Sequence, residues 1–267
     1  MIRDITIGQY YKADSVIHRL DPRVKLMGTL IFIISLFMGM NIWIYAVVTV
    51  ALAVVIKMSR IPLKFMVRGL KSIVILIIIS AVFNLFLTPG DVLIQIWKLT
   101  INYQGLKMAI FMVVRLIYLI VGTSLMTLTT TPNNLTDGLE KGLGFLKVIK
   151  VPVHEIAMMM SIALRFIPIL IEETDKIMKA QMARGADFEN GSLIKRAKAM
   201  VPILVPLFVS AFRRANELAM AMEARCYHGS EGRTKMKPLK YEKRDRIAYI
   251  SMVLYLGVII IVKIIAA

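Results

Sequence analysis

Hydrophobic positions along this chain occur in long runs that are separated by shorter charged segments. Residues 24–57 are apolar except around residues 39–41, and further apolar runs cover residues 72–87, 108–131 and 246–265. A helix needs roughly 17–25 predominantly apolar residues to cross the hydrocarbon core of a bilayer. We therefore expect about five membrane-spanning helices, with two short ones sharing residues 24–57.

Residues 153–229 follow a different pattern, in which apolar positions recur every three or four residues. Charged residues of both signs lie between them, including Glu172, Glu173 and Asp175. This spacing predicts two long amphipathic helices, over residues 153–184 and 193–226. We interpret the region as too charged to cross a membrane, although residues 201–209 are apolar enough to dip into its surface.

Several shorter signals lie at the ends of the expected spans. Asp21 precedes Pro22, which predicts a helix start with Asp21 as its cap; a docking role for this stretch is the alternative. Residues 57–71 carry five cations and no acid, which predicts a cytoplasmic loop. The connection over residues 88–107 is expected to hold a short interfacial helix. Arg115, inside the fourth span, is expected to extend toward the outer surface; a functional role is the alternative, because charges within a membrane are costly.

Composition narrows the class of protein. The chain has 267 residues, is 58% hydrophobic and carries a net charge of +17. Its cations flank apolar runs, which favours contact with an anionic membrane surface over nucleic acid. Cys226 is the single cysteine, so an intrachain disulfide is excluded. The sequence has no glycine-rich phosphate loop, no nucleophile–base pair and no metal-ligand spacing, so we expect no cofactor and no enzyme activity.

The distribution of cations also predicts orientation. With residues 57–71 inside, the N-terminus and residues 132–243 are cytoplasmic, and the C-terminus is outside. We therefore predict an all-α membrane protein in three parts. Residues 1–131 form a four-span membrane region, residues 132–243 a cytoplasmic region with the two long amphipathic helices, and residues 244–267 the last transmembrane helix.

Both amphipathic helices end in the same short motif, Ala-x-x-Ala-Arg followed by a small residue. The first copy ends in Ala183, Arg184 and Gly185, and the second ends in Ala224, Arg225 and Cys226. Arginine in the last turn of a helix is a common cap, so an internal duplication of structural caps is one interpretation. The other is docking, because a smooth alanine face enters a groove and the guanidinium offers a planar set of donors to a partner.

These motifs resemble the transmembrane T-component of energy-coupling factor (ECF) transporters, which is related to the membrane subunit of cobalt and nickel uptake systems. The resemblance covers almost the whole chain. It is carried by the segments 18–23, 130–140 and 162–168 and by the two arginine motifs. The family pattern is Ala-Arg-Gly at both sites, so Cys226 is a departure, and it lacks the free access of glycine to positive φ.

The resemblance implies a bacterial cell-membrane complex of this chain, two ABC-type ATPases and a small substrate-binding membrane protein, the S-component. In that family the two motifs, here Ala183–Gly185 and Ala224–Cys226, end crossed coupling helices and dock into the ATPases. The chain would transmit ATP-driven motion for uptake of a vitamin or another micronutrient, with ATP bound by the partners. The alternatives are the permease of an ordinary ABC importer with its own substrate pathway, and an intramembrane enzyme.

Overall fold

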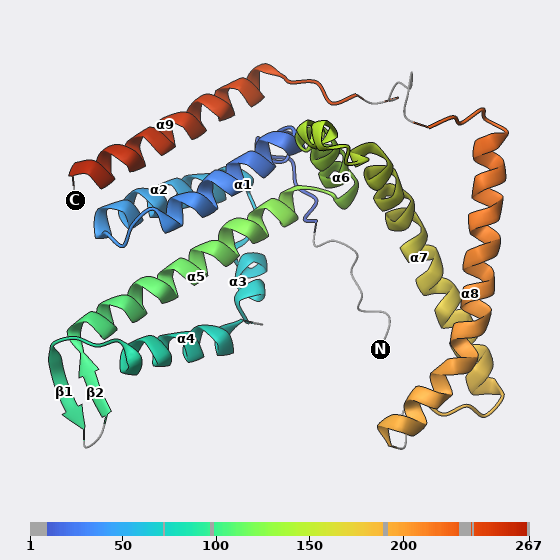
Figure 1. Ribbon diagram of the computed structural model, residues 1–267, viewed down its shortest axis with the longest axis horizontal. Coiled ribbons are helices and arrows are strands. Elements are labelled where there is room, and N and C mark those ends of the chain that lie inside the picture. Colours follow the sequence, from blue (N-terminus) through green and yellow to red (C-terminus); the bar gives the residue numbers. More distant parts are fainter. Residues whose placement is uncertain are drawn as a thin grey trace. The chain divides into compact units, whose positions relative to one another are not determined.

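The computed structural model describes residues 10–71, 73–96, 99–188, 192–229, 236 and 238–265. Nearly all of the regular structure in these residues is helical (Figure 1). The elements are α1 (Pro22–Phe37), α2 (Ile42–Ser59), α3 (Leu63–Lys71), α4 (Val74–Leu87), β1 (Val92–Ile96), β2 (Leu99–Asn102), α5 (Tyr103–Thr129), α6 (Pro132–Gly142), the 3-10 helix η2 (Gly144–Ile149), α7 (Val153–Ala183), α8 (Leu193–Glu223) and α9 (Lys243–Ile265). The predicted all-α membrane fold is confirmed.

The contacts divide the chain into two compact units. Among the residues described, one unit comprises residues 10–139 and 239–265, and the other comprises residues 140–238. We name them the bundle unit and the α7/α8 unit. The first and last apolar runs therefore belong to one body, although almost the whole chain separates them. The predicted division into three consecutive parts follows chain order rather than these contacts, and it stays a prediction.

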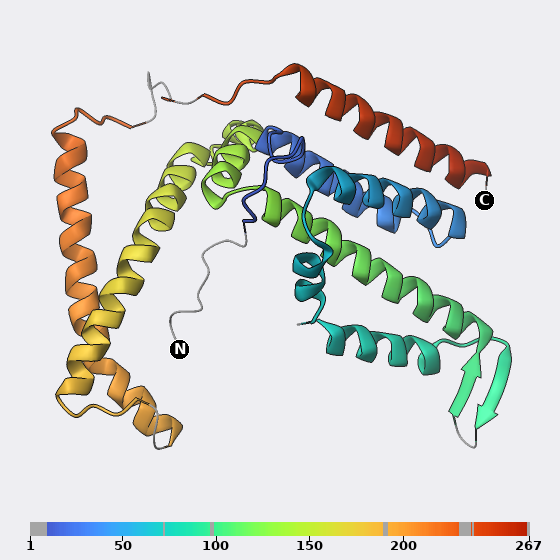
Figure 2. The ribbon, with the colours of Figure 1, turned by 180° about the vertical axis from the view of Figure 1, so that it is seen from behind.

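In the bundle unit, α1 and α2 lie between α5 and α9, and α4 runs along α5 (Figures 1 and 2). Two buried clusters hold these helices together. Leu36, Ile44 and Val48 pack with Ile259 of α9, and Met66 of α3 packs with leucines of α5. The outer faces carry large exposed aliphatic side chains, as expected of helices that face lipid.

Close packing between α4 and α5 depends on a glycine. A Cβ atom added to Gly105 would lie 2.9 Å from the Leu85 carbonyl oxygen, so a larger residue would force the backbones apart. Small residues serve this purpose between membrane helices, where close van der Waals contact replaces the hydrophobic effect.

The two short helices expected in residues 24–57 are present as α1, of 16 residues, and α2, of 18 residues. Of these two, α2 is long and apolar enough to cross a membrane by itself, and α1 is not among such helices. Asp21 caps α1, because its side chain accepts a hydrogen bond from the Arg23 amide at 2.9 Å and Pro22 follows it. The Asn41 side chain caps α2 in the same way, accepting from the Trp43 amide at 3.1 Å. The Asp21 cap was predicted from the sequence because caps are local structures, whereas the Asn41 cap was not predicted.

Two connections differ from their predictions. The basic segment 57–71 contains the helix α3. Together, α3 and α4 are long and apolar enough to form one bent membrane span. The expected interfacial helix in residues 88–107 is wrong, because β1 and β2 form an antiparallel pair with Ile94 opposite Ile101. Their alternating, β-branched residues suit a strand, and only four or five residues are available on each side.

Four helices are long and apolar enough to cross a membrane by themselves, or five candidates with the bent pair, among the residues described. They include α2, α5 and α9, as predicted, but also α7. The first half of α7 is apolar enough for a membrane span, because most of its charges gather in its second half. The prediction that charge alone keeps this stretch out of a membrane is therefore wrong for α7.

Candidate functional site

The first arginine motif lies at the end of α7, where the backbone forms a complete Schellman cap. The Gly185 amide donates to the Met182 carbonyl at 2.9 Å, and the Ala186 amide donates to the Gln181 carbonyl at 3.0 Å. Gly185 has φ +90°, which a glycine adopts without steric cost. Arg184 is therefore the last residue before the chain reverses direction.

The second motif, after α8, repeats this geometry bond for bond. The Cys226 amide donates to the Glu223 carbonyl at 2.8 Å, and the Tyr227 amide donates to the Met222 carbonyl at 3.1 Å. Cys226 occupies the left-handed position with φ +55°. The departure from glycine therefore leaves the cap intact, at the cost of a mildly unfavourable backbone conformation.

Arg184 and Arg225 hold equivalent positions in these two caps. Both residues are exposed, and neither side chain makes a hydrogen bond or an ion pair with any residue that the structure describes. Each end therefore presents a full set of guanidinium donors beside a smooth turn. A planar guanidinium of this kind suits a carboxylate or a set of backbone carbonyls in another protein.

The two ends lie at opposite ends of an antiparallel helix pair. Arg214 Nη2 in α8 donates to Glu173 Oε2 in α7 at 3.0 Å, and the Tyr227 hydroxyl, just after α8, donates to Met158 Sδ near the start of α7 at 3.2 Å. These contacts pair late residues of one helix with early residues of the other. The tip of α8 consequently lies near the start of α7, away from the tip of α7 (Figure 1).

An exposed apolar stripe runs along α8. Phe208 and Phe212 lie one turn apart with ring centroids at 6.0 Å, and each is about two-thirds exposed. The stripe consists of Met200, Val201, Leu204, Val205, Phe208, Val209 and Phe212, and its middle part is hollowed. Contiguous exposed apolar surface of this extent is typical of a protein or membrane contact. The predicted membrane-dipping segment 201–209 is part of it.

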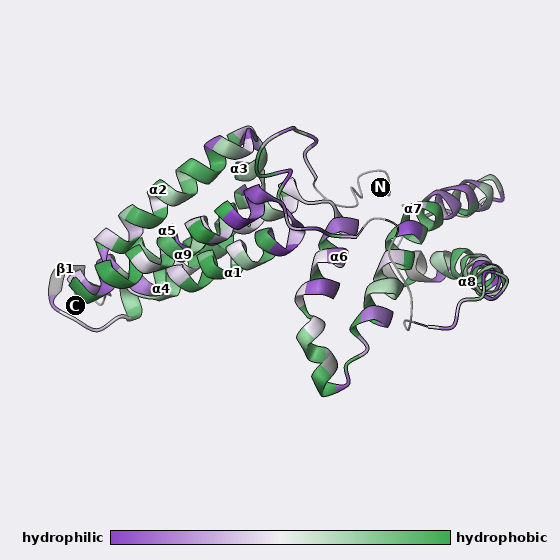
Figure 3. Ribbon diagram, turned by 90° about the horizontal axis from the view of Figure 1, so that it is seen from above, coloured by the Kyte–Doolittle hydropathy of each residue, from purple (hydrophilic) through white to green (hydrophobic). Residues whose placement is uncertain are grey.

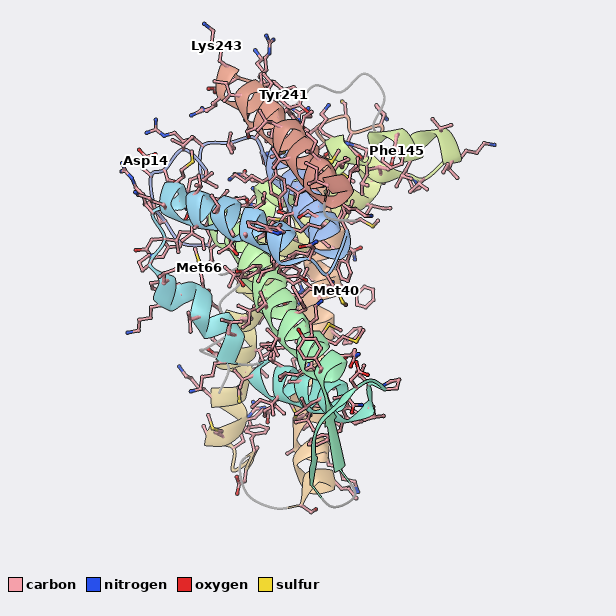
Figure 4. All side chains as sticks on the ribbon, turned by 90° about the vertical axis from the view of Figure 1, so that its left-hand side faces the viewer. Asp14, Met40, Met66, Phe145, Tyr241 and Lys243 are labelled. Carbon is pink, nitrogen blue, oxygen red and sulfur yellow. The ribbon has the colours of Figure 1, made fainter. Side chains whose placement is uncertain are left out.

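In the bundle unit, the segment before α1 forms a buried polar cluster with the start of α9. The Asp21 amide donates to Asp245 Oδ1 at 2.9 Å, and Asp245 Oδ2 accepts from the Glu242 amide at 2.8 Å. Arg23 pairs with Asp21 at 2.8 Å and stacks on the ring of Tyr241 at 3.8 Å. Figure 4 shows Tyr241 and Lys243 beside this end of α9. The segment 18–23 thus connects the start of α1 to the start of α9, in addition to beginning a helix.

The titratable groups of this segment respond to their burial. Burial lowers the pKa of the His18 imidazole, whose Nδ1 and Nε2 atoms lie 2.7 Å from Ser15 Oγ and 3.0 Å from the Tyr11 carbonyl. Burial alone would raise the pKa of the Asp21 carboxyl, but the hydrogen bonds and positive charge of Arg23 outweigh it and lower that pKa. Asp21 therefore stays ionised and Arg23 keeps its partner.

Sequence reasoning missed Asp245 as a partner of this segment. Its position in the first turn of α9 was visible, but a first-turn acid is ordinary. Only the fold brings it to Asp21, from 224 residues away along the chain.

Arg115 was expected to reach toward the outer surface, and this expectation is wrong. Its side chain lies between helices with 8% of the residue exposed. Nε donates to the Tyr45 hydroxyl at 3.0 Å, and the guanidinium lies 5.0 Å from the centroid of the Phe37 ring. Arg115 thus joins α5 to the end of α1 and the start of α2.

His154 lies against Glu140, with its Nδ1 atom 2.9 Å from Glu140 Oε1. This contact holds the end of α6 to the start of α7. Groups of three or more histidine, cysteine or carboxylate side chains arranged for a metal ion are not found within the described residues.

Comparisons with known proteins identify the family of this chain. The family described as "CbiQ: Cobalt transport protein" matches residues 13–236. The chain belongs to this family. It is 57% identical over 250 residues to the energy-coupling factor transporter transmembrane protein EcfT of Clostridium kluyveri, with 93% of each chain covered. It is 47% identical over 254 residues to the protein of the same name from Bacillus subtilis, with 95% of this chain and 96% of that one covered.

The predicted resemblance to the T-component of ECF transporters is therefore confirmed. The main functional prediction, a transmembrane component of such a transporter, fits these relatives, whereas the permease of an ordinary ABC importer does not. Together with the apolar helices, this makes the chain a multi-pass membrane protein.

Proposed function

We propose that this chain is the non-catalytic coupling subunit of an ECF transporter. It joins two ABC-type ATPases to a substrate-binding S-component and transmits ATP-driven motion between them, for uptake of a vitamin or another micronutrient. The observation that carries the proposal is the pair of matching caps with exposed arginines, Arg184 and Arg225. ATP is bound by the partners, and this chain has no cofactor of its own.

Each ATPase receives one helix end in this proposal. The residues that dock are Ala183, Arg184 and Gly185 at the first end and Ala224, Arg225 and Cys226 at the second. Each cap ends its helix abruptly and turns the following residues away. The turn and the guanidinium can therefore enter a groove of the ATPase without obstruction by the residues that follow. The exposed apolar stripe of α8 contacts the S-component within the membrane surface.

The orientation follows the cation distribution. The N-terminus and residues 132–243 are cytoplasmic, where ATP is available, and the C-terminus is outside. A reporter placed at Ser192 should therefore read as cytoplasmic, and one fused after Ala267 as extracytoplasmic. A cytoplasmic signal from the second reporter would remove the last span from the proposal.

The deciding experiment reverses both arginines, Arg184→Glu and Arg225→Glu, in a tagged chain expressed with its ATPases. Stranding one partner of an interfacial charge pair costs about 2–5 kcal/mol, so one reversal should weaken docking at its end about a hundredfold or more. The other end preserves part of the assembly through avidity. We expect single variants to transport poorly and the double variant to lose its ATPases in a pull-down.

A matched control reverses two exposed cations on the same helices, Lys176→Glu and Arg213→Glu. This variant has the same charge change but intact helix ends, so it should keep its ATPases. Normal ATPase stoichiometry in the Arg184→Glu/Arg225→Glu variant would show that the two arginines are structural caps only.

A further inference from the structure

A hollow of about 600 Å³ opens at one end of the bundle unit. Three separate segments line it: the stretch before α1, the end of α2 and the start of α9. The lining residues are Asp14, Ser15, Val16, Arg19, Lys57, Met58, Arg60 and Arg244. Figure 4 shows Asp14 beside one end of α2, with Met40 at the other. The hollow thus lies beside the end of α2 and the start of α9, and both helices are candidate membrane spans.

The lining is strongly cationic, with four cations and one acid. Asp14 is paired with Arg19, and Arg244 is paired at 2.7 Å with Glu242, which lies outside the hollow. Lys57 and Arg60 are exposed and form no ion pair or hydrogen bond with any side chain that the structure describes. After these acids are counted, the charge of Lys57 and Arg60 remains uncompensated.

The backbone places these cations together. Arg60 follows α2 in the left-handed conformation, with φ +56°, and Lys57 lies about one turn earlier on the same helix. Arg244 lies in the first turn of α9, and α9 packs against α2. The Arg244 Nε–H is buried and has no acceptor among the described residues, although Nη2 is bound to Glu242. Arg244 therefore retains one donor that no described group satisfies.

An apolar track continues from the hollow along both helices. Met58, Val54 and Val50 follow one another at four-residue spacing on α2, and they are 43%, 50% and 64% exposed. On α9, Ile247 lies one turn below Arg244 and is 66% exposed. Residues at this spacing share one helix face, so the basic hollow and the apolar track are continuous. A ligand that fits both has an anionic head and a hydrocarbon tail.

We propose that this hollow binds the headgroup of an anionic phospholipid, such as phosphatidylglycerol, with its acyl chains along the track on α2 and α9. Clusters of arginine and lysine between membrane helices recognise such headgroups by charge. A soluble phosphate compound would use the basic hollow but not the track. An acidic segment of a partner protein would bind the cations without a membrane and without an acyl chain on the track.

The test uses the purified full chain in a neutral detergent, titrated with phosphatidylglycerol or with zwitterionic phosphatidylcholine, and measures bound lipid by native mass spectrometry. The variant Lys57→Gln/Arg60→Asn/Arg244→Gln removes the three central cations, with asparagine chosen because it tolerates positive φ. The matched variant Lys64→Gln/Lys71→Gln/Arg246→Gln removes three exposed cations outside the hollow. A second variant, Met58→Glu, places an acid in the hollow while keeping every cation.

We expect the unchanged chain and the matched variant to prefer phosphatidylglycerol, and the hollow variant to lose on the order of 100-fold in that preference, at roughly fivefold per cation. Met58→Glu should weaken the same preference. Equal loss in both triple variants would reveal only general surface charge and overturn the proposal. Full competition by glycerol 3-phosphate would identify a site for soluble phosphates and would reject the lipid proposal. Equal binding of phosphatidylglycerol and phosphatidylcholine would reject the lipid proposal as well.

Discussion

The bundle unit and the α7/α8 unit use polar and apolar residues in opposite ways. In the bundle unit, buried polar side chains such as Asp245 and Arg115 join helices, while apolar side chains face outward. In the α7/α8 unit, Val153, Ala157 and Ile203 are the buried apolar residues among those described, and charged residues lie exposed along both helices. Figure 3 shows this contrast in hydropathy, with hydrophilic bands along α7.

The contrast follows from what surrounds each unit. Helices in lipid gain no hydrophobic energy from packing against each other, so hydrogen bonds and close contacts between them carry specificity. Long helices with little buried surface are instead stabilised by contacts with other molecules. The comparison indicates that the bundle unit has a core of its own, whereas the α7/α8 unit buries few of its apolar side chains among the residues described.

The largest expected effect is in the buried cluster of the bundle unit. Asp245→Ala removes the acceptor of the buried Asp21 amide and of the partly buried Glu242 amide. Each unsatisfied buried donor costs about 1–3 kcal/mol, so we expect roughly 3 kcal/mol of lost stability, measured by unfolding in mixed micelles. Glu172→Ala, at an exposed carboxylate of α7, is the control and should change stability by less than about 0.5 kcal/mol. Equal losses of stability in the two variants would contradict the proposed difference between the two units.

A somewhat smaller effect is expected at Arg115. Arg115→Met keeps most of the side-chain volume but removes the hydrogen bond to Tyr45 and the contact with Phe37. Hydrogen bonds to charged groups are worth about 1.5–3 kcal/mol, although relief of burying the charge offsets part of this. We expect a loss of about 1–2 kcal/mol, and Tyr45→Phe should reproduce part of it without altering any charge. A stable Arg115→Met protein that no longer transports would instead assign Arg115 a functional role.

The ion pair between α7 and α8 should contribute less. Glu173 and Arg214 are partly exposed, with 24% and 36% of their side chains accessible. Exposed pairs contribute about 0.2–1 kcal/mol in double-mutant cycles. A cycle of Glu173→Gln and Arg214→Gln should give a coupling below about 1 kcal/mol in the isolated chain. A coupling above 2 kcal/mol would show that the α7/α8 pair is rigid without partners.

The smallest effect is expected for Cys226→Gly. Cys226 has φ +55°, so glycine relieves the strain of that conformation but gains freedom in the unfolded chain. These terms nearly cancel, and we expect a change within about 0.5 kcal/mol of stability and unchanged ATPase binding. Cys226→Val, with a β-branched side chain at the same φ, is the contrasting variant and should destabilise the cap. If Cys226→Gly altered ATPase binding while stability stayed constant, the thiol itself would contact the partner.

The amino-acid sequence by itself determined the local features of this protein. Apolar run lengths predicted α2, α5 and α9, and Asp21 predicted the start of α1, because helix length and capping depend on neighbours along the chain. The two arginine motifs were also visible as a repeat. Periodicity placed α7 and α8 nearly residue for residue, since amphipathic helices show their spacing directly.

Only the tertiary structure decided which distant residues meet. It showed that Asp245 binds the Asp21 amide, that Arg115 is buried against Tyr45, and that Lys57, Arg60 and Arg244 surround one hollow. It also showed that Cys226 completes the same cap as Gly185. These outcomes depend on how helices pack and on where the backbone turns, and no spacing within a single segment encodes the partner that another segment supplies.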